Sequence, residues 1–301
     1  MIQAVQSYLA VRHAAGFDLA NADYLLRSFA LFAVERNETH VRATTAIDWA
    51  SQSSSLAQRD ERLKTVCRFA RYIHTEDNRH EVPPANHFGY RKTRRVPHIY
   101  SSAEINHLID AALHLAPPGA LRPQTYATLI GLLAATGLRI SEALSLQFSD
   151  VTSSGLLVRK TKFQKTRLLP LHETTAAGLD RYLTRRRQVR SKEKNVFITD
   201  DGQPLPYQHV NSTFRKLLKT TNLSASDGTR PRLHDMRHTF AVRALEASPA
   251  GRQHISQHML ALATYMGHVN ISATYWYLEI TPELLCDIAV ASEGFLYGGP
   301  L

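Results

Sequence analysis

The chain carries the stretch LHDMRHTFA at residues 233–241, where a histidine and an arginine stand three positions apart at the start of an apolar run. Residues three apart share one face of a helix, so His234 and Arg237 would present an imidazole and a guanidinium together. Such a pair suits an oxyanion or a phosphate, because arginine offers a planar fork of donors and histidine can also move a proton. A surface helix with a basic edge shows the same spacing, so the rest of a site must be sought elsewhere.

The composition favours a two-domain protein that meets a polyanion. A length of 301 residues suggests about two domains, and a hydrophobic content of 44% is enough to build their cores. The formal net charge of +10 makes nucleic acid the first candidate partner, with a merely basic protein as the alternative. No apolar run approaches the ~18 residues of a membrane span, and the N-terminus lacks a signal-peptide pattern.

Cysteine and histidine usage predicts neither a disulfide framework nor a metal site. Cys67 and Cys286 lie far apart and lack metal-ligand spacing. His254 and His258 are four residues apart, yet no third ligand or glutamate accompanies them in a zinc pattern. We therefore expect no metal, no cofactor and a reducing, cytoplasmic setting.

The N-terminal part, residues 1–90, is predicted to be a helical domain. Helices are expected near Ile2–Val11, from a cap at Asn21 or Asp23 through Phe32, near Thr44–Ala50, and from about Ser55 to Ile73. In the last of these, Lys64, Arg68 and Arg71 fall on one side of the helix. This basic stripe would follow a phosphate backbone, and a solvated helix face is an equal alternative.

A short basic segment is predicted to link two domains. Pro83 and Pro84 break the helical pattern, and residues 91–98 combine basic side chains with a closing proline. Its candidate polyanion contacts are Arg91, Lys92, Arg94 and Arg95. A solvated tether is the alternative. The second domain then covers residues 99–301.

Two helices of the second domain meet at a predicted turn. An apolar helix from about Thr125 to Ala135 should end with Gly137 as its C-cap, and a new helix should follow. Arg139 lies at this junction and Glu142 three residues on, where a carboxylate would hold the guanidinium in a fixed pose. A plain helix-turn-helix with a surface ion pair is the alternative.

Residues 155–171 are predicted to form a β-hairpin. Residues 155–159 and 167–171 have strand character, and the segment between them carries Lys160, Lys162 and Lys165. Such a tip could deliver an ammonium into a DNA groove, although charged turns are common. Further along, the sequence favours a solvated basic run at 185–187, a short strand at 196–199 and a helix at 210–218 that carries Arg215 and Lys216.

Four blocks of the second domain resemble the tyrosine recombinases, also called the phage-integrase family. They are ATGLRISE at 135–142, HDMRHTF at 234–240, MGH at 266–268 and Tyr277, in the family's order, with the lysine hairpin between the first two. The resemblance covers about residues 99–290, and the first ~95 match only as a generic helical DNA-clamping domain. It implies a mainly α fold with a small β-sheet (α+β). A helical core-binding (SAM-like) domain and a catalytic domain would together clamp DNA.

The resemblance implies a site-specific recombinase or integrase that acts in DNA integration, excision or transposition. Strands would be cleaved and rejoined through a 3′-phosphotyrosine, without metal or ATP. It places Arg139 and Arg237 on the phosphate, and Glu142 as the acid that orients them. It adds hydrogen bonds from His234 and His268. His234 would also help to deprotonate the nucleophile, while His238 would be structural. The general acid aligns with Lys162, with Lys165 as the near rival and Lys160 less favoured.

The nucleophile has three candidates, Tyr265, Tyr275 and Tyr277. The family places its tyrosine nine residues after the Gly-His histidine, which selects Tyr277. Tyr275 would face away from it on a helix. This chain departs from the family in having Met266 before Gly-His, where leucine is usual, and Glu279 two residues after the tyrosine, where histidine is usual.

The expected partners are double-stranded DNA with an inverted-repeat recombination site and further copies of the chain. In this family a C-terminal helix, here about 282–290, docks into a neighbouring subunit, which would give a dimer or tetramer on DNA; docking onto its own domain is the alternative. A type IB topoisomerase and a non-catalytic DNA-binding relative are the rival functions. A cytoplasmic, nucleoid-associated location without membrane contact is expected.

Overall fold

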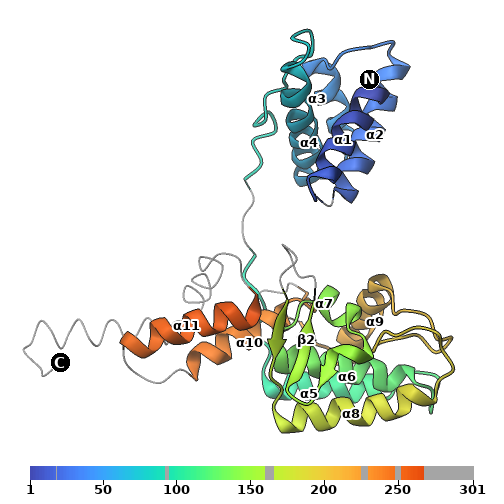
Figure 1. Ribbon diagram of the computed structural model, residues 1–301, viewed down its shortest axis with the longest axis vertical. Coiled ribbons are helices and arrows are strands. Elements are labelled where there is room, and N and C mark those ends of the chain that lie inside the picture. Colours follow the sequence, from blue (N-terminus) through green and yellow to red (C-terminus); the bar gives the residue numbers. More distant parts are fainter. Residues whose placement is uncertain (18, 92–94, 160–165, 225–229, 248–251, 268–301) are drawn as a thin grey trace, which may run out of the picture. The chain divides into compact units, whose positions relative to one another are not determined.

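The computed structural model describes residues 1–301 except 18, 92–94, 160–165, 225–229, 248–251 and 268–301 (Figure 1). The chain divides into two compact units, Met1–Arg95 and Val96–Leu301. Their boundary falls within the predicted linker at 91–98. Among the described residues, no helix combines the length and the apolar character that crossing a membrane requires.

The first unit is a helical bundle with its own core. Its helices are α1 (Ile2–Ala14), α2 (Ala20–Glu35), α3 (Ala43–Ser51) and α4 (Leu56–His74). Fully buried aromatic side chains hold them together, and Phe29 meets Trp49 edge-on with ring centroids 5.5 Å apart. Ser55 caps α4 as expected, because its hydroxyl accepts a hydrogen bond from the Gln58 N–H.

The second unit surrounds a small sheet with helices. Its elements are α5 (Ser102–Leu113), α6 (Arg122–Thr136), α7 (Ile140–Ser145), a 3₁₀ turn (Phe148–Asp150), β1 (Val151–Thr152), β2 (Gly155–Val158), β3 (Arg167–Leu169), α8 (Glu173–Gln188), α9 (Tyr207–Thr220), α10 (Asp235–Glu246) and α11 (Arg252–Met266). Helix α6 packs against α5, α8 and α10, which explains why it is apolar on almost every side. The predicted mainly α fold with a small β-sheet is confirmed.

The sheet is an antiparallel meander in the order β1-β2-β3. Leu156 lies opposite Leu169, and Val158 lies opposite Arg167. The predicted hairpin is therefore present, with shorter strands than expected and one additional strand, β1. Its lysine-bearing tip, residues 160–165, lies outside the described residues. Strand β3 contacts α11 and so brings the hairpin to the C-terminal part of the unit.

Two helix ends create the turns of the candidate site. Gly137 ends α6 in the left-handed region at φ 61°, and its N–H bonds the Leu133 carbonyl at 3.0 Å. A Cβ there would lie 2.6 Å from Cδ1 of Phe240, so α10 also requires glycine at this position. Helix α11 ends at Met266 and is followed by Gly267 at φ 66°. Helices α10 and α11 share an apolar interface and lie side by side (Figure 1).

Three local expectations were wrong. Helix α2 begins after Leu19, because Asp23 lies in its first turn and pairs with Arg27 instead of capping it. Residues 196–199 do not form a strand of the sheet, because the Val196 N–H donates a hydrogen bond to the Leu146 carbonyl instead of pairing with a neighbouring strand. Arg186 is 2% exposed, since its guanidinium bonds the carbonyls of residues 193 and 195 and does not face solvent.

Candidate active site

Arg139 is fixed by the residue that the sequence paired with it. It lies in the turn between α6 and α7, and its Nη1 donates to Oε1 of Glu142 at 2.7 Å. The backbone N–H of Arg139 donates to the other oxygen of Glu142 at 3.1 Å. Glu142 is 6% exposed, whereas the Arg139 side chain keeps 28% of its surface accessible beside an open cleft. The guanidinium is thus oriented from behind and reachable from solvent.

Arg237 joins two turns that are far apart in the sequence. It lies in the first turn of α10 and is 3% exposed. Its Nη1 donates to the carbonyl of Gly137 at 2.6 Å, and its Nη2 donates to the carbonyl of Met266 at 2.7 Å. One guanidinium therefore links the end of α6 to the end of α11. The structure brings Arg139 and Arg237 together, although Arg139 lies in the turn before α7 and Arg237 in α10.

Three arginines converge on the end of α11. The last carbonyls of a helix have no partner within the helix and carry partial negative charge, so guanidinium groups suit them. Each of three consecutive carbonyls accepts a bond from a different arginine: Tyr265 from Arg167 Nε at 2.8 Å, Met266 from Arg237 Nη2 at 2.7 Å, and Gly267 from Arg139 Nη2 at 3.3 Å. The next residue in the chain is His268.

Arg167 is a member of this group that the sequence did not single out. Its Nη2 donates to Oε2 of Glu142 at 2.9 Å, and its Nη1 lies 3.2 Å from Oε1. Burial raises the pKa of Glu142, but the hydrogen bond and charge of Arg167 and the hydrogen bonds of Arg139 outweigh it and hold the pKa below its ordinary value. The only sequence signal was an arginine at the start of a predicted strand, and this signal does not indicate its partners, which lie 25 and 98 residues away.

His234 lies where the helix that carries Arg237 begins. It occupies the N-cap position of α10, and its ring meets the ring of His238 edge-on, with centroids 4.9 Å apart. Partial desolvation, followed by the charge of Arg237, lowers the pKa of His234. Desolvation and the neighbouring His234 lower the pKa of His238 to about 4. Both rings are therefore neutral near pH 7, and a neutral imidazole can accept a proton.

Several predicted residues lie outside the described part of the chain. They are Lys92, Arg94, Lys160, Lys162, Lys165, His268, Tyr275, Tyr277, Glu279, Cys286 and the helix expected at 282–290. Tyr265, the third tyrosine weighed as a nucleophile, is described. Its hydroxyl lies 3.4 Å from the Pro170 carbonyl and its ring stacks on Phe240. These contacts give Tyr265 a packing role.

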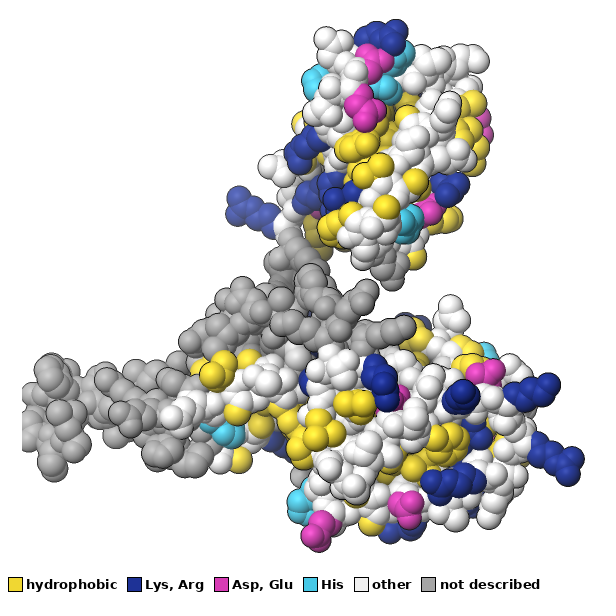
Figure 2. Space-filling model, in the orientation of Figure 1, with side chains coloured by type: hydrophobic (Ala, Val, Ile, Leu, Met, Phe, Trp, Pro, Cys, Tyr) yellow, Lys and Arg dark blue, Asp and Glu magenta, His cyan; other side chains and the backbone are white. Residues whose placement is uncertain are grey.

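The basic residues proposed for DNA differ in their surroundings. Lys64 pairs with Asp60 at 2.8 Å, and Arg68 pairs with Glu61 at 3.1 Å, so acids of α4 balance part of that stripe. The remaining described candidates, Arg71, Arg91, Arg95, Arg215 and Lys216, are exposed. In Figure 2, Lys and Arg side chains are spread over the visible face of each unit.

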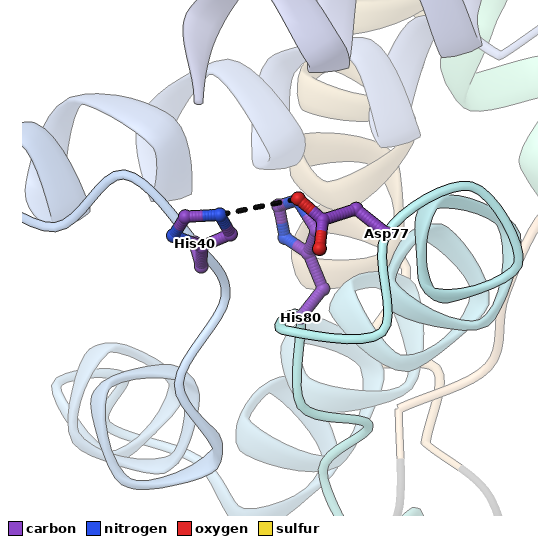
Figure 3. A group of neighbouring side chains, drawn as sticks. All are labelled: His40, Asp77 and His80. Atoms are coloured by element: carbon purple, nitrogen blue, oxygen red, sulfur yellow. Dashed lines mark hydrogen bonds and ion pairs between the residues drawn. The ribbon is translucent and has the colours of Figure 1, made fainter.

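One group of described side chains has the chemistry of metal ligands. His40, Asp77 and His80 meet between the loops that flank α3 and α4 in the first unit (Figure 3). However, Nδ1 of His80 accepts the Val41 N–H at 3.0 Å, so Nε2 of a neutral ring carries the proton and cannot bind a metal. Asp77 is also paired with Arg79 at 2.7 Å. The group fits a hydrogen-bonded clamp between two loops better than a cation site.

Comparison with known proteins gives matches across both units. The family model described as the phage integrase family matches residues 100–283. The chain is similar to the putative integrase/recombinase y4rB of Sinorhizobium fredii, with 38% identity over 295 residues, covering 94% of each chain.

Solved structures share the fold at low sequence identity. The XerH site-specific recombinase, in a post-cleavage complex with its palindromic difH substrate, matches with a TM-score of 0.66 at 17% identity. That match covers 91% of this chain and 79% of the other. A lambda integrase(75–356) dimer bound to a COC′ core site matches with a TM-score of 0.62 at 18% identity, covering 90% and 96%.

Proposed function

The chain belongs to the phage integrase family, and we propose that it is a site-specific recombinase that cleaves and rejoins DNA through a 3′-phosphotyrosine intermediate. The observation that carries the proposal is the convergence of Arg139 and Arg237 at the end of α11, directly before His268. Two guanidiniums that converge on one turn, with that of Arg139 accessible from solvent, suit the two non-bridging oxygens of a phosphodiester.

The proposed cleavage is an in-line displacement at phosphorus. The Tyr277 oxygen forms a bond to the phosphorus as the bond from phosphorus to the 5′ oxygen of the next nucleotide breaks. Arg139 and Arg237 balance the negative charge that builds on the phosphate oxygens, assisted by His268. The phosphotyrosine conserves the energy of the broken bond, so a 5′ hydroxyl can reverse the step without ATP.

Two proton transfers accompany this displacement. The phenol must lose its proton, and neutral His234 is the proposed acceptor, consistent with its lowered pKa. The departing 5′ oxygen must gain a proton, which Lys162 of the hairpin would supply, with Lys165 as the rival. Two guanidiniums beside the phosphate provide the positive charge that a metal supplies in many nucleases.

The proposal extends to how the chain binds DNA and associates with further copies of itself. The XerH and lambda integrase structures are DNA complexes, and the latter is a dimer. We propose that this chain binds a duplex with inverted-repeat half-sites and that the segment 282–290 docks into a neighbouring copy. The proposed DNA contacts include the exposed Arg71 and Arg215, one from each unit.

A covalent-adduct assay tests this function. A duplex selected by the wild-type protein from a random-sequence library is nicked near the cleavage position, so that a cleaved end diffuses away and traps the protein on DNA. The wild type should form a covalent adduct, Tyr277→Phe should form none, and Tyr275→Phe should retain it. An adduct in Tyr277→Phe would overturn the nucleophile, and no adduct with the wild type would overturn the function.

A further inference from the structure

We propose that Arg167 is a positioning residue for strand cleavage, which acts by sharing Glu142 with Arg139 and by holding the end of α11 against β3. This inference rests on the proposed recombinase function. Arg167 itself need not contact DNA, because its side chain is 11% exposed and its described contacts are with protein atoms.

The first half of this role concerns the carboxylate of Glu142. Each of its oxygens accepts one bond from Arg167 and one from Arg139, counting the Arg139 backbone N–H. Arg167 therefore occupies one side of the carboxylate and restricts Arg139 to a single side-chain bond there. A guanidinium has five N–H donors, so Arg139 keeps donors for a phosphate. Without Arg167, the buried carboxylate would draw both Nη groups of Arg139 into a bidentate pair.

The second half of this role concerns the backbone after α11. The Nε of Arg167 donates to the Tyr265 carbonyl at 2.8 Å, so β3 is tied to the last turn of α11. The fit is close, because a Cβ on Gly267 would lie 2.7 Å from Nη1 of Arg167. Glycine at 267 thus allows the left-handed turn and also leaves room for the guanidinium.

Arg167 connects the elements that carry the proposed catalytic groups. It opens β3, the strand that follows the lysine segment 160–165 in sequence. It bonds Glu142, which orients Arg139, and it bonds the backbone two residues before Gly267. A shift of about 1 Å in such a support can slow a reaction by about 100-fold. Arg167 is placed to set the mutual positions of Arg139, β3 and the end of α11.

The test compares Arg167→Gln with Arg159→Gln. Arg159 is a matched control, because it also lies in the hairpin and pairs with an acid, Asp150, but does not contact Glu142. On the nicked duplex selected by the wild type, Arg167→Gln should bind with unchanged affinity and cleave about 10- to 100-fold more slowly at saturating protein. Arg159→Gln should cleave at least about 10-fold faster than Arg167→Gln, because it leaves the bonds of Arg167 to Glu142 and Tyr265 intact. Equal rates for Arg167→Gln and the wild type would overturn the proposal.

A second pair of variants separates positioning from a general loss of structure. If Arg167 acts through Glu142, the effects of Arg167→Gln and Glu142→Gln should not multiply, and the double variant should cleave no more slowly than the slower of the two single variants. Multiplying effects would contradict the shared carboxylate. If Arg167→Gln does not fold, Arg167→Lys serves instead, since an ammonium cannot bridge two carboxylate oxygens and the Tyr265 carbonyl.

A readout without DNA distinguishes this inference from the proposed function. Hydrogen exchange of the amides at 264–267 should be faster in Arg167→Gln and unchanged in Arg159→Gln, because Arg167 bonds the Tyr265 carbonyl at the end of α11 and the described partner of Arg159 is Asp150. Unchanged exchange in both variants would overturn the positioning role even if the wild type cleaves DNA. Faster exchange in Arg167→Gln, together with a wild-type protein that forms no adduct, would support the positioning role and overturn the proposed function.

Discussion

Arg237 is held by two carbonyl groups that belong to different turns. Its guanidinium is buried, and each terminal nitrogen donates to one of those carbonyls. We expect Arg237→Lys to slow covalent-adduct formation by at least about 100-fold, because an ammonium cannot link both turns and still present a fork to the phosphate. Single-turnover cleavage of the selected nicked duplex measures this.

Arg243→Lys is the control for that prediction. Arg243 lies on the same helix and also donates to a carbonyl, that of Tyr100, at 2.6 Å. Its loss should leave adduct formation near the wild-type rate, since neither α11 nor the turn at Gly137 contains its partner. If the two variants slow cleavage equally, the defect belongs to α10 as a whole and not to the phosphate clamp.

At the same scale, the sequence identified those contacts that are local in the chain. Arg139 and Glu142 are three residues apart, and helical spacing alone predicted their pairing. The sequence did not identify Arg167 as a member of the site, because its partners lie 25 and 98 residues away and no local pattern brings β3 to α7 and α11. The burial of Arg186 was not predicted for a similar reason, since the carbonyls that accept its hydrogen bonds belong to a loop beyond α8.

The end of α6 is an element whose geometry depends on one glycine. Gly137 has φ 61°, and a Cβ there would approach Phe240 of α10 to 2.6 Å. Gly137→Ala should lower the free energy of unfolding by about 1–3 kcal/mol from backbone strain, before the clash is counted. Calorimetry of the full chain, read in the transition of the second unit, provides the measurement.

Gly131→Ala offers a matched substitution in the same helix. A Cβ at Gly131 would lie 3.7 Å from Cδ1 of Ile109, an ordinary contact, and its backbone is helical. Alanine there should raise the free energy of unfolding by up to about 1 kcal/mol, because it reduces the entropy lost on folding. A destabilisation as large as that of Gly137→Ala would mean that the helix tolerates no added methyl group and that the turn is not the cause.

The loops at 39–43 and 77–81 form a pH-sensitive clamp in the first unit. Burial, followed by the charge of His40, lowers the pKa of His80 below 6.5, and the Val41 N–H requires Nδ1 of His80 to be unprotonated. The unfolded chain therefore takes up a proton near pH 6.5 that the folded form resists. The contribution of His80 to the free energy of unfolding is therefore fully present above that pH, and the free energy of unfolding should fall as the pH drops from 7 to about 5.5.

His80→Gln tests the assignment of that pH dependence. Its side-chain oxygen can still accept a hydrogen bond but does not titrate, so the melting temperature of the first unit should vary less between pH 7 and about 5.5. His107→Gln removes an exposed histidine of α5 and should leave the wild-type dependence intact. The same dependence in His80→Gln and the wild type would assign the effect to another group.

Elements with a long amphipathic pattern were predictable, and short ones were not. The four helices of the first unit follow from spacing and caps, among them Ser55 at the start of α4. Strand β1 has only two residues, and residues 196–199 form a single bridge, Ile198 to Pro204, although they have the composition of a strand. In both cases tertiary pairing decided the outcome, which no local pattern records.

At the scale of the whole molecule, the net charge of +10 predicts that the chain neutralises several phosphates when it binds DNA, and the salt dependence of binding measures how many. Each phosphate neutralised by a basic side chain contributes about 0.9 to the slope of log K against log salt concentration. Arg71 of α4 and Arg215 of α9 are exposed and belong to different units. Each alanine substitution should weaken binding to the selected duplex and reduce the slope by about 1.

The double variant asks whether both units bind one duplex at the same time. If they do, Arg71→Ala with Arg215→Ala should reduce the slope by about 2, because two independent phosphate contacts are lost from one complex. Arg181→Ala removes the same charge from the exposed face of α8 and should leave the slope unchanged. If the double variant has the slope of either single variant, only one of the two units holds DNA, and a clamp formed by both would be wrong. The salt titration thus tests an arrangement of the two units that neither unit reveals by itself.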